Sequence, residues 1–184
     1  MTYVKSMKFC LTDKKGVRAA CPLAERRGVA KIPGKTTALW QWGEDMDSIR
    51  LATEDDIEVL CAFDPVAQED SHRRDFIRRA VTSGNCSVTI VAGRAAAYGV
   101  LEYSFFDNGF ISMLMVHPDY RRGGLGEALM RHMEAACRTP KLFTSTNLSN
   151  LPMQALLAKL GYLLSGVIHN LDEGDPELIY FRKK

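Results

Sequence analysis

A glycine-rich segment in the middle of the chain carries the clearest chemical signal of the sequence. It follows an apolar run that ends at Val116, and an amphipathic helical pattern comes directly after it. The segment contains Arg121, Arg122, Gly123, Gly124, Leu125 and Gly126. Such a turn presents backbone N–H groups at the positive end of a helix dipole, glycines allow close approach, and arginines add forked donors. These residues therefore predict a site for a phosphate or pyrophosphate group.

Two common phosphate-binding motifs do not fit this segment. A P-loop requires Lys and then Ser or Thr after its last glycine, whereas Glu127 follows Gly126 here. A dinucleotide fingerprint requires a third glycine where Leu129 stands, and an acidic residue about 20 positions further on, which is missing. The remaining alternative is a purely structural turn with solvated arginines.

The elements around this turn follow from hydrophobic periodicity and turn residues. A first helix is expected after Thr53, which is a plausible N-cap. Further along the chain, Asp107-Asn108-Gly109 predicts a hairpin turn. The predicted order is β-α-α-β-β-β-α-β-α-β-β. We expect strands over 48–52, 86–92, 95–106, 110–116, 142–146, 162–169 and 177–182, and further helices over 71–82, 125–136 and 150–160.

Two segments resemble recurrent motifs of the GCN5-related N-acetyltransferase (GNAT) family. Arg121-x-x-Gly124-x-Gly126 after a buried strand resembles its acyl-CoA signature, and a helix opened by Asn150 and ending in Lys159-Leu160-Gly161-Tyr162 is similar to its second motif. The resemblance runs from about Ser48 to Arg182 and implies an α/β fold with a GNAT-like mixed, mostly antiparallel central sheet flanked by helices. The closing residues 170–178 resemble a bacterial subgroup of the family without an assigned substrate.

The resemblance implies acetyl-CoA as co-substrate and no metal. Backbone amides of Arg122, Gly123, Gly124, Leu125 and Gly126 would hold the pyrophosphate. Main-chain groups of Leu114, Met115 and Val116, on a strand splayed from its neighbour, would bond the pantetheine and polarise the acetyl carbonyl. Asn150 would bond the pantetheine arm, or would simply cap its helix.

The sequence departs from the family pattern at both catalytic positions. Leu157 stands where many members have a tyrosine that protonates the departing thiolate, and it has no proton to give. Ser112 stands where many members have a glutamate that acts as base, and it is a poor base. A base is still expected, because an ammonium cannot attack a thioester.

Three groups of residues are candidates near the acceptor. Glu102, on the neighbouring strand, is the first candidate for the base, with an exposed strand carboxylate as the alternative. His117 is the second, because histidines titrate near neutral pH, but it stands before Pro118 and is equally consistent with a turn. The acidic residues 172–175 either attract a cationic substrate or form a solvated hairpin tip.

The first 45 residues differ from the rest of the chain. They contain nine Lys and Arg and four Asp and Glu, a net charge of +5, which leaves −3 for residues 46–184. We expect residues 1–45 to form a basic, poorly ordered extension, with a targeting arm, a nucleic-acid-binding tail or a start codon placed too early as alternatives. Residues 46–184 are expected to form one acyl-CoA-binding domain without an electrostatic footprint for nucleic acid.

The function that follows is transfer of acetyl from acetyl-CoA to a primary amine by direct attack, the amine belonging to a small cationic molecule or to a protein. The alternative is a non-catalytic acyl-CoA sensor or interaction module on the same fold. The five cysteines form no CxxC pair, no signal-peptide pattern begins at Met1, and no apolar run approaches the ~20 residues of a membrane span. We therefore expect a cytoplasmic protein without a membrane partner. The sequence does not decide the oligomeric state, and a homodimer is one of the alternatives.

Overall fold

The computed structural model describes residues 46–184, and the predicted basic extension 1–45 lies outside this part. The strands are β1 (Met46–Leu51), β2 (Cys86–Val91), β3 (Arg94–Phe105), β4 (Asn108–Val116), β5 (Lys141–Asn147), β6 (Leu163–Ile168) and β7 (Glu177–Lys183). The helices are α1 (Ile57–Phe63), α2 (Pro65–Glu69), α3 (Ser71–Thr82), α4 (Leu125–Ala136) and α5 (Leu151–Lys159), with single 3₁₀ turns η1 (Glu54–Asp56) and η2 (Pro118–Tyr120). No helix among these residues is long and apolar enough to cross a membrane.

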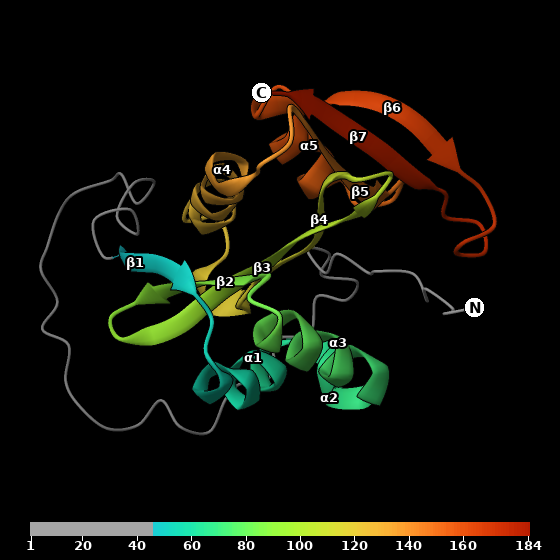
Figure 1. The fold of residues 1–184 in the computed structure, drawn as a ribbon. Coiled ribbons are helices and arrows are strands. Elements are labelled where there is room, and N and C mark those ends of the chain that lie inside the picture. The colour runs from blue at the N-terminus through green and yellow to red at the C-terminus, as the bar shows by residue number, and fades with distance from the viewer. Residues whose placement is uncertain (1–45) are drawn as a thin grey trace, which may run out of the picture.

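The seven strands form one sheet in the order β1-β2-β3-β4-β5-β7-β6. The pair β4–β5 is parallel and the other neighbouring pairs are antiparallel, which confirms the predicted fold class. Helices α1–α3 pack on one face of the sheet, and α4 and α5 pack on the other (Figure 1). We call these the α1–α3 face and the α4–α5 face.

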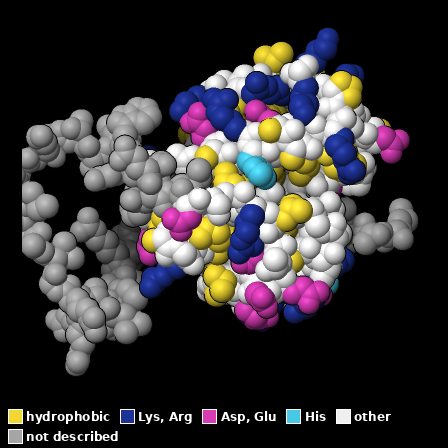
Figure 2. All heavy atoms as spheres, turned by 60° about the vertical axis from the view of Figure 1, so that its left-hand side comes forward, with side chains coloured by type: hydrophobic (Ala, Val, Ile, Leu, Met, Phe, Trp, Pro, Cys, Tyr) yellow, Lys and Arg dark blue, Asp and Glu magenta, His cyan; other side chains and the backbone are white. Residues whose placement is uncertain are grey.

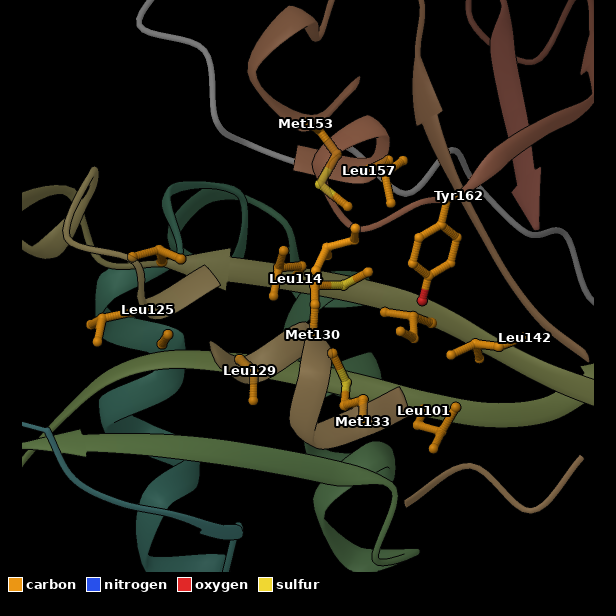
Figure 3. Close-up of a cluster of buried hydrophobic side chains, with 14 of the residues drawn as sticks. Leu101, Leu114, Leu125, Leu129, Met130, Met133, Leu142, Met153, Leu157 and Tyr162 are labelled. Atoms are coloured by element: carbon orange, nitrogen blue, oxygen red, sulfur yellow. The ribbon is translucent and has the colours of Figure 1, made fainter. Parts of the chain in front are cut away.

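Strand β4 is buried on both faces, as its continuous apolar run predicts. Leu114 and Val116 belong to the core under α4 and α5, whereas Met113 and Met115 belong to the core under α1–α3. Figure 3 shows how Met130 of α4 and Met153 and Leu157 of α5 gather around Leu114. Both helices are thereby anchored on the same strand.

Helix α2 is an element that the sequence analysis did not predict. Asp64 caps it, because its Oδ1 accepts from the N–H groups of Val66 and Ala67 at 2.9 and 3.4 Å, and Pro65 occupies the first helical position. An Asp-Pro pair at these positions is a recognised helix start, so the signal was present in the sequence. The five-residue helix is too short to show a periodicity of its own.

The same Asp64 ties this cap to the sheet. Its other oxygen accepts a 2.6 Å hydrogen bond from the Tyr98 hydroxyl on β3, and Nε of Arg73 on α3 lies 3.8 Å away. All three side chains are buried, and Asp64 and Tyr98 are fully inaccessible to solvent. Burial and the neighbouring carboxylate raise the pKa of Tyr98 well above its usual value, so Tyr98 stays a donor.

The hairpin between β3 and β4 turns one position earlier than predicted. Phe106 and Asp107 have positive φ values of 49° and 58° and form the turn, whereas Asn108 and Gly109 already belong to β4. Gly109 is required by packing rather than by the turn. A Cβ there would lie 2.5 Å from Cys137 Sγ and 3.1 Å from Leu142 Cδ1.

The Asp64 network makes a testable contribution to stability. Asp64→Ala removes the α2 cap, the acceptor of the Tyr98 hydroxyl and the anion beside Arg73, so we expect it to lower the free energy of unfolding by about 3 to 5 kcal/mol. Urea denaturation measures this loss. The control is Asp75→Ala, which breaks a 3.3 Å pair with Arg78 whose two side chains are both more than half exposed, and it should change stability by less than about 0.5 kcal/mol. Equal losses in the two variants would contradict the buried network.

Candidate functional site

The central feature of the site is the separation of β4 from β5. The two strands are paired only from Gly109 to Ile111 on β4 and from Leu142 to Thr144 on β5. Beyond that point β4 stays paired with β3 as far as Val116, so its edge toward β5 has no strand partner among residues 46–184. Backbone groups along this edge must find hydrogen-bond partners elsewhere, in side chains, water or a ligand.

Thr144 closes the last paired position of this opening. Its hydroxyl donates a 2.9 Å hydrogen bond to the carbonyl oxygen of Ile111, and the side chain is fully buried. The bond satisfies the last carbonyl before the strands diverge. The sequence analysis did not single out Thr144, because only the strand pairing shows that it lies at the point of divergence.

The glycine-rich turn lies where β4 leads into α4. Arg122 and Gly124 both have left-handed backbones, with φ values of 64° and 87°, and Gly124 is the N-cap of α4 without a capping side chain. The first-turn N–H groups of α4 have no acceptor within the helix. A Cβ on Gly126 would lie 3.6 Å from Val116 and 3.7 Å from Leu156, which is ordinary contact. The turn therefore offers amides to an anion, and packing within the chain does not require Gly126.

Several charged side chains near the turn are bound by other groups of the chain. Figure 2 looks onto the side of the molecule where β1 and α4 lie in Figure 1, and Lys and Arg side chains gather in its upper part. Nε of Arg121 donates to the carbonyl oxygen of Val116 at 3.2 Å. Glu127 in the first turn of α4 accepts from Arg131 at 3.0 Å and from Lys159 of α5 at 2.5 Å. The ion pair with Lys159 links the two helices that flank the opening.

Asn150 and Leu157 lie on α5 as the motif requires. Oδ1 of Asn150 accepts from the N–H of Met153 at 3.3 Å, so the residue caps the helix, and it is almost fully buried. Leu157 is fully buried in the core with Leu114. An apolar side chain therefore occupies the position at which many family members place a proton donor.

Strands β4 and β5 thus separate beside a turn that offers backbone amides. The comparisons with known proteins agree with this geometry. The sequence model of the acetyltransferase (GNAT) family matches residues 42–162. This chain belongs to the GNAT family.

Solved structures agree with this assignment. A GNAT-family acetyltransferase from Bacillus cereus shares 33% identity over 74% of this chain and 96% of its own, with a TM-score of 0.70. The ribosomal-protein-S18-alanine N-acetyltransferase of Escherichia coli shares 19% identity over 74% and 92%, with a TM-score of 0.61. A protein from Bacillus anthracis, solved with acetyl coenzyme A, shares 15% identity over 54% and 61%, with a TM-score of 0.50. No curated protein sequence matches this chain.

In this GNAT protein, Glu102 lies beside the start of the opening. It pairs with Phe110 across β3–β4, and Ser112 is the additional residue of a β-bulge at this point. Burial raises the pKa of Glu102, and the nearby Ser112 hydroxyl and Arg79 offset part of the rise. Oγ of Ser112 is buried and makes no well-formed hydrogen bond to any described residue. The pair therefore places a half-buried carboxylate and a hydroxyl next to the diverging strands.

The second candidate for the base, His117, lies at the other end of β4. Its Nδ1 accepts from the N–H of Asp119 at 3.2 Å, and its ring packs between Phe63 and Tyr120, each 5.5 Å away. It lines a separate hollow of about 520 Å³ together with Arg50 and Arg94. Because Glu102 pairs with a residue near the start of β4, the two candidates are separated by roughly 20 Å along the strand and cannot serve the same reacting atom.

The acidic residues before β7 hold the chain rather than form a free hairpin tip. Oδ2 of Asp172 accepts from Asn147 at 2.9 Å, and Asp175 accepts from the N–H and hydroxyl of Ser149 at 2.9 and 2.7 Å. These bonds tie the β6–β7 connection to the loop between β5 and α5. Of the predicted acidic set, only Glu173 is exposed.

Glu177 is a carboxylate of this region that the sequence analysis missed. It is buried at the start of β7, opposite Asn147 of β5, and its Oε2 has no hydrogen-bond partner within residues 46–184. Burial raises its pKa, the Ser145 hydroxyl offsets part of the rise, and Asp172 and Asp175 increase it. The residues around Glu177 are typical of an ordinary strand end, so no local signal in the sequence distinguishes this carboxylate from an exposed one.

The raised pKa of Glu177 predicts a pH-dependent stability. The folded protein binds this proton more tightly than the unfolded chain does, so stability falls as the pH rises from the unfolded pKa through the raised folded one. Glu177→Gln removes the buried charge, so it should be more stable than the wild type at about pH 7.5, with a gain that disappears near pH 4. Urea denaturation over this range measures the gain. The exposed control Glu173→Gln should show none, and a gain for Glu177→Gln that does not vary with pH would contradict the assignment.

Proposed function

We propose that this protein transfers the acetyl group of acetyl-CoA to a primary amine by direct attack. The observation that carries the proposal is the opening between β4 and β5, which leads from the amide-lined turn at the start of α4 to the Glu102–Ser112 pair. The E. coli relative is named for acetylating an alanine of a ribosomal protein, and the B. anthracis relative holds acetyl coenzyme A. Both support acetyl-CoA and an amine as the two substrates.

Each end of the opening has residues suited to part of this reaction. First-turn amides of α4 and the left-handed Arg122 and Gly124 would bind the pyrophosphate. Main-chain groups of Leu114, Met115 and Val116, on the unpaired edge of β4, would hold the pantetheine and donate to the acetyl carbonyl as its negative charge develops. Acetyl-CoA supplies the activated thioester when bound.

Glu102 is the base in this proposal. The ammonium of the acceptor must lose a proton before nitrogen attacks, and a half-buried carboxylate with a raised pKa is suited to accept it. The acetyl group passes from sulfur to nitrogen, and the thiolate leaves with the CoA. The nitrogen loses a second proton as the amide forms, and because Leu157 has no proton to give, that proton would reach the thiolate through water.

Binding of acetyl-CoA is the first test. Saturation at about a hundred times the dissociation constant should stabilise the full chain by about 2.7 kcal/mol, which a thermal melt detects. Gly126→Ala should fold at least as stably, because its Cβ makes only ordinary contacts, but should reduce the shift by hindering the phosphate. Gly166→Ala is the control, because a Cβ there meets nothing within 4 Å, and it should keep the full shift. A folded wild-type sample without any shift would refute the proposal.

Turnover separates the enzyme from the alternative, a non-catalytic acyl-CoA sensor. Glu102→Gln should lower kcat/KM by roughly 10² to 10⁴ and remove the acid limb of the pH–rate profile, while the acetyl-CoA thermal shift stays intact. Ser112→Ala removes a group that lowers the pKa of Glu102, so its acid limb should move to higher pH. Release of free thiol measures the rates. Acetyl-CoA binding without acetylation of any amine would favour the sensor, and an unaltered profile in Glu102→Gln would exclude Glu102 as the base.

A further inference from the structure

An apolar groove crosses the α1–α3 face of the sheet beside the proposed reaction site. Its volume is about 380 Å³, at the lower end of the range for pockets that bind small molecules. No charged side chain is among the described residues that line it. The residues that matter for its shape and polarity are Phe105, Phe143, Gly166, Val167, Ile168 and Ile179.

An aromatic strip connects the groove to Glu102. The Phe105 ring stacks on Phe110, with centroids 4.9 Å apart and planes 22° apart, and lies 5.2 Å from the Phe143 ring. Phe110 is also the cross-strand partner of Glu102. Because cross-strand partners point to the same face, the Glu102 carboxylate lies at the end of this strip.

Glu177 on β7 lies next to residues of the groove but does not line it. Ile168 of β6, which lines the groove, is the cross-strand partner of Glu177. Oε2 of Glu177 is buried without a hydrogen-bond partner in the described part of the chain, and Ile179, two residues further along β7, shares its face of the sheet. The groove thus has an apolar lining, with the Glu102 carboxylate at the end of the aromatic strip, an arrangement that complements one cation attached to an apolar body.

The residues that would favour a polycation do not reach this groove. Asp172 and Asp175 are engaged by Asn147 and Ser149, and neither lines the groove. A second ammonium group placed along the floor would lose its hydration to phenylalanine and aliphatic side chains without a carboxylate beside it. A desolvated charge of this kind is unfavourable, so the groove selects against polyamines.

We propose that the acceptor is a small primary amine with an aromatic or other large apolar group close to its amino nitrogen. The apolar group would lie on Phe143 and Ile179 in the groove, and the amino group would face Glu102 at the mouth of the β4–β5 opening. This inference rests on the proposed acetyltransferase function and narrows its acceptor from primary amines in general. Phe143 is then a specificity-determining residue.

The experiment compares three amines with the full chain and acetyl-CoA. 2-Phenylethylamine, ethylamine and the polyamine precursor 1,4-diaminobutane share the reacting group and differ in the body attached to it. We expect kcat/KM to be highest for 2-phenylethylamine. Phe143→Ala should lower kcat/KM for 2-phenylethylamine by about ten- to hundredfold, mostly through KM, and for ethylamine much less. The control is Val59→Ala, an exposed apolar residue on α1 outside the groove, which should leave the ratio between the amines unchanged.

The outcomes separate this inference from the function on which it rests. Acetyl-CoA binding with no amine acetylated would refute the proposed function. Faster acetylation of 1,4-diaminobutane, or an equal loss for all three amines in Phe143→Ala, would refute the apolar acceptor while the acetyltransferase function stands. A competing occupant is a second copy of the chain along the edge strand β6, whose Leu163 and Leu164 are exposed. If Phe143→Ala weakens self-association and leaves KM unchanged, the groove forms the contact between two copies of the chain and does not bind the acceptor.

Discussion

Strands β4 and β5 pair over three residue positions and then separate, and the rest of the site depends on this separation. A continuous ladder would satisfy the edge of β4 internally and leave no main-chain groups for a ligand. The side chains of Leu114 and Val116 on β4 pack with Leu157 and Met153 of α5 on the same side of the sheet. The core under α4 and α5 therefore contributes directly to the geometry of the opening.

This core also limits the chemistry that the chain has available. Leu157 is fully buried and contributes to the packing that anchors α5, so a larger polar residue there would have to be accommodated in a close-packed interior. In the proposed reaction, the departing thiolate would have no protein proton donor at this position. The demand on the protein would then fall mainly on binding, on orientation and on removing the proton from the amine.

The buried carboxylates illustrate a balance between stability and function. Burial raises the pKa of both Glu102 and Glu177, which means that each is less favourable as an anion in the folded protein than in water. The third buried carboxylate, Asp64, accepts hydrogen bonds from the Tyr98 hydroxyl and two backbone amides. Partners of this kind make a buried carboxylate part of the framework of the fold, whereas carboxylates with perturbed pKa values are typical of sites that bind or react.

Features that are local in the chain could be predicted from the residues alone. The strand–turn–helix around Arg121 to Gly126, the helix cap at Asn150 and nearly every element followed from periodicity and turn chemistry, because these depend on near neighbours. The sequence analysis missed the short α2 and shifted one hairpin turn, since Gly109 is needed for packing against Cys137 rather than for turning. The arrangement of side chains at the opening follows from tertiary contacts instead. Glu102 and Ser112 come from neighbouring strands, and their proximity depends on the strand pairing and on the bulge in β4, which no local pattern encodes.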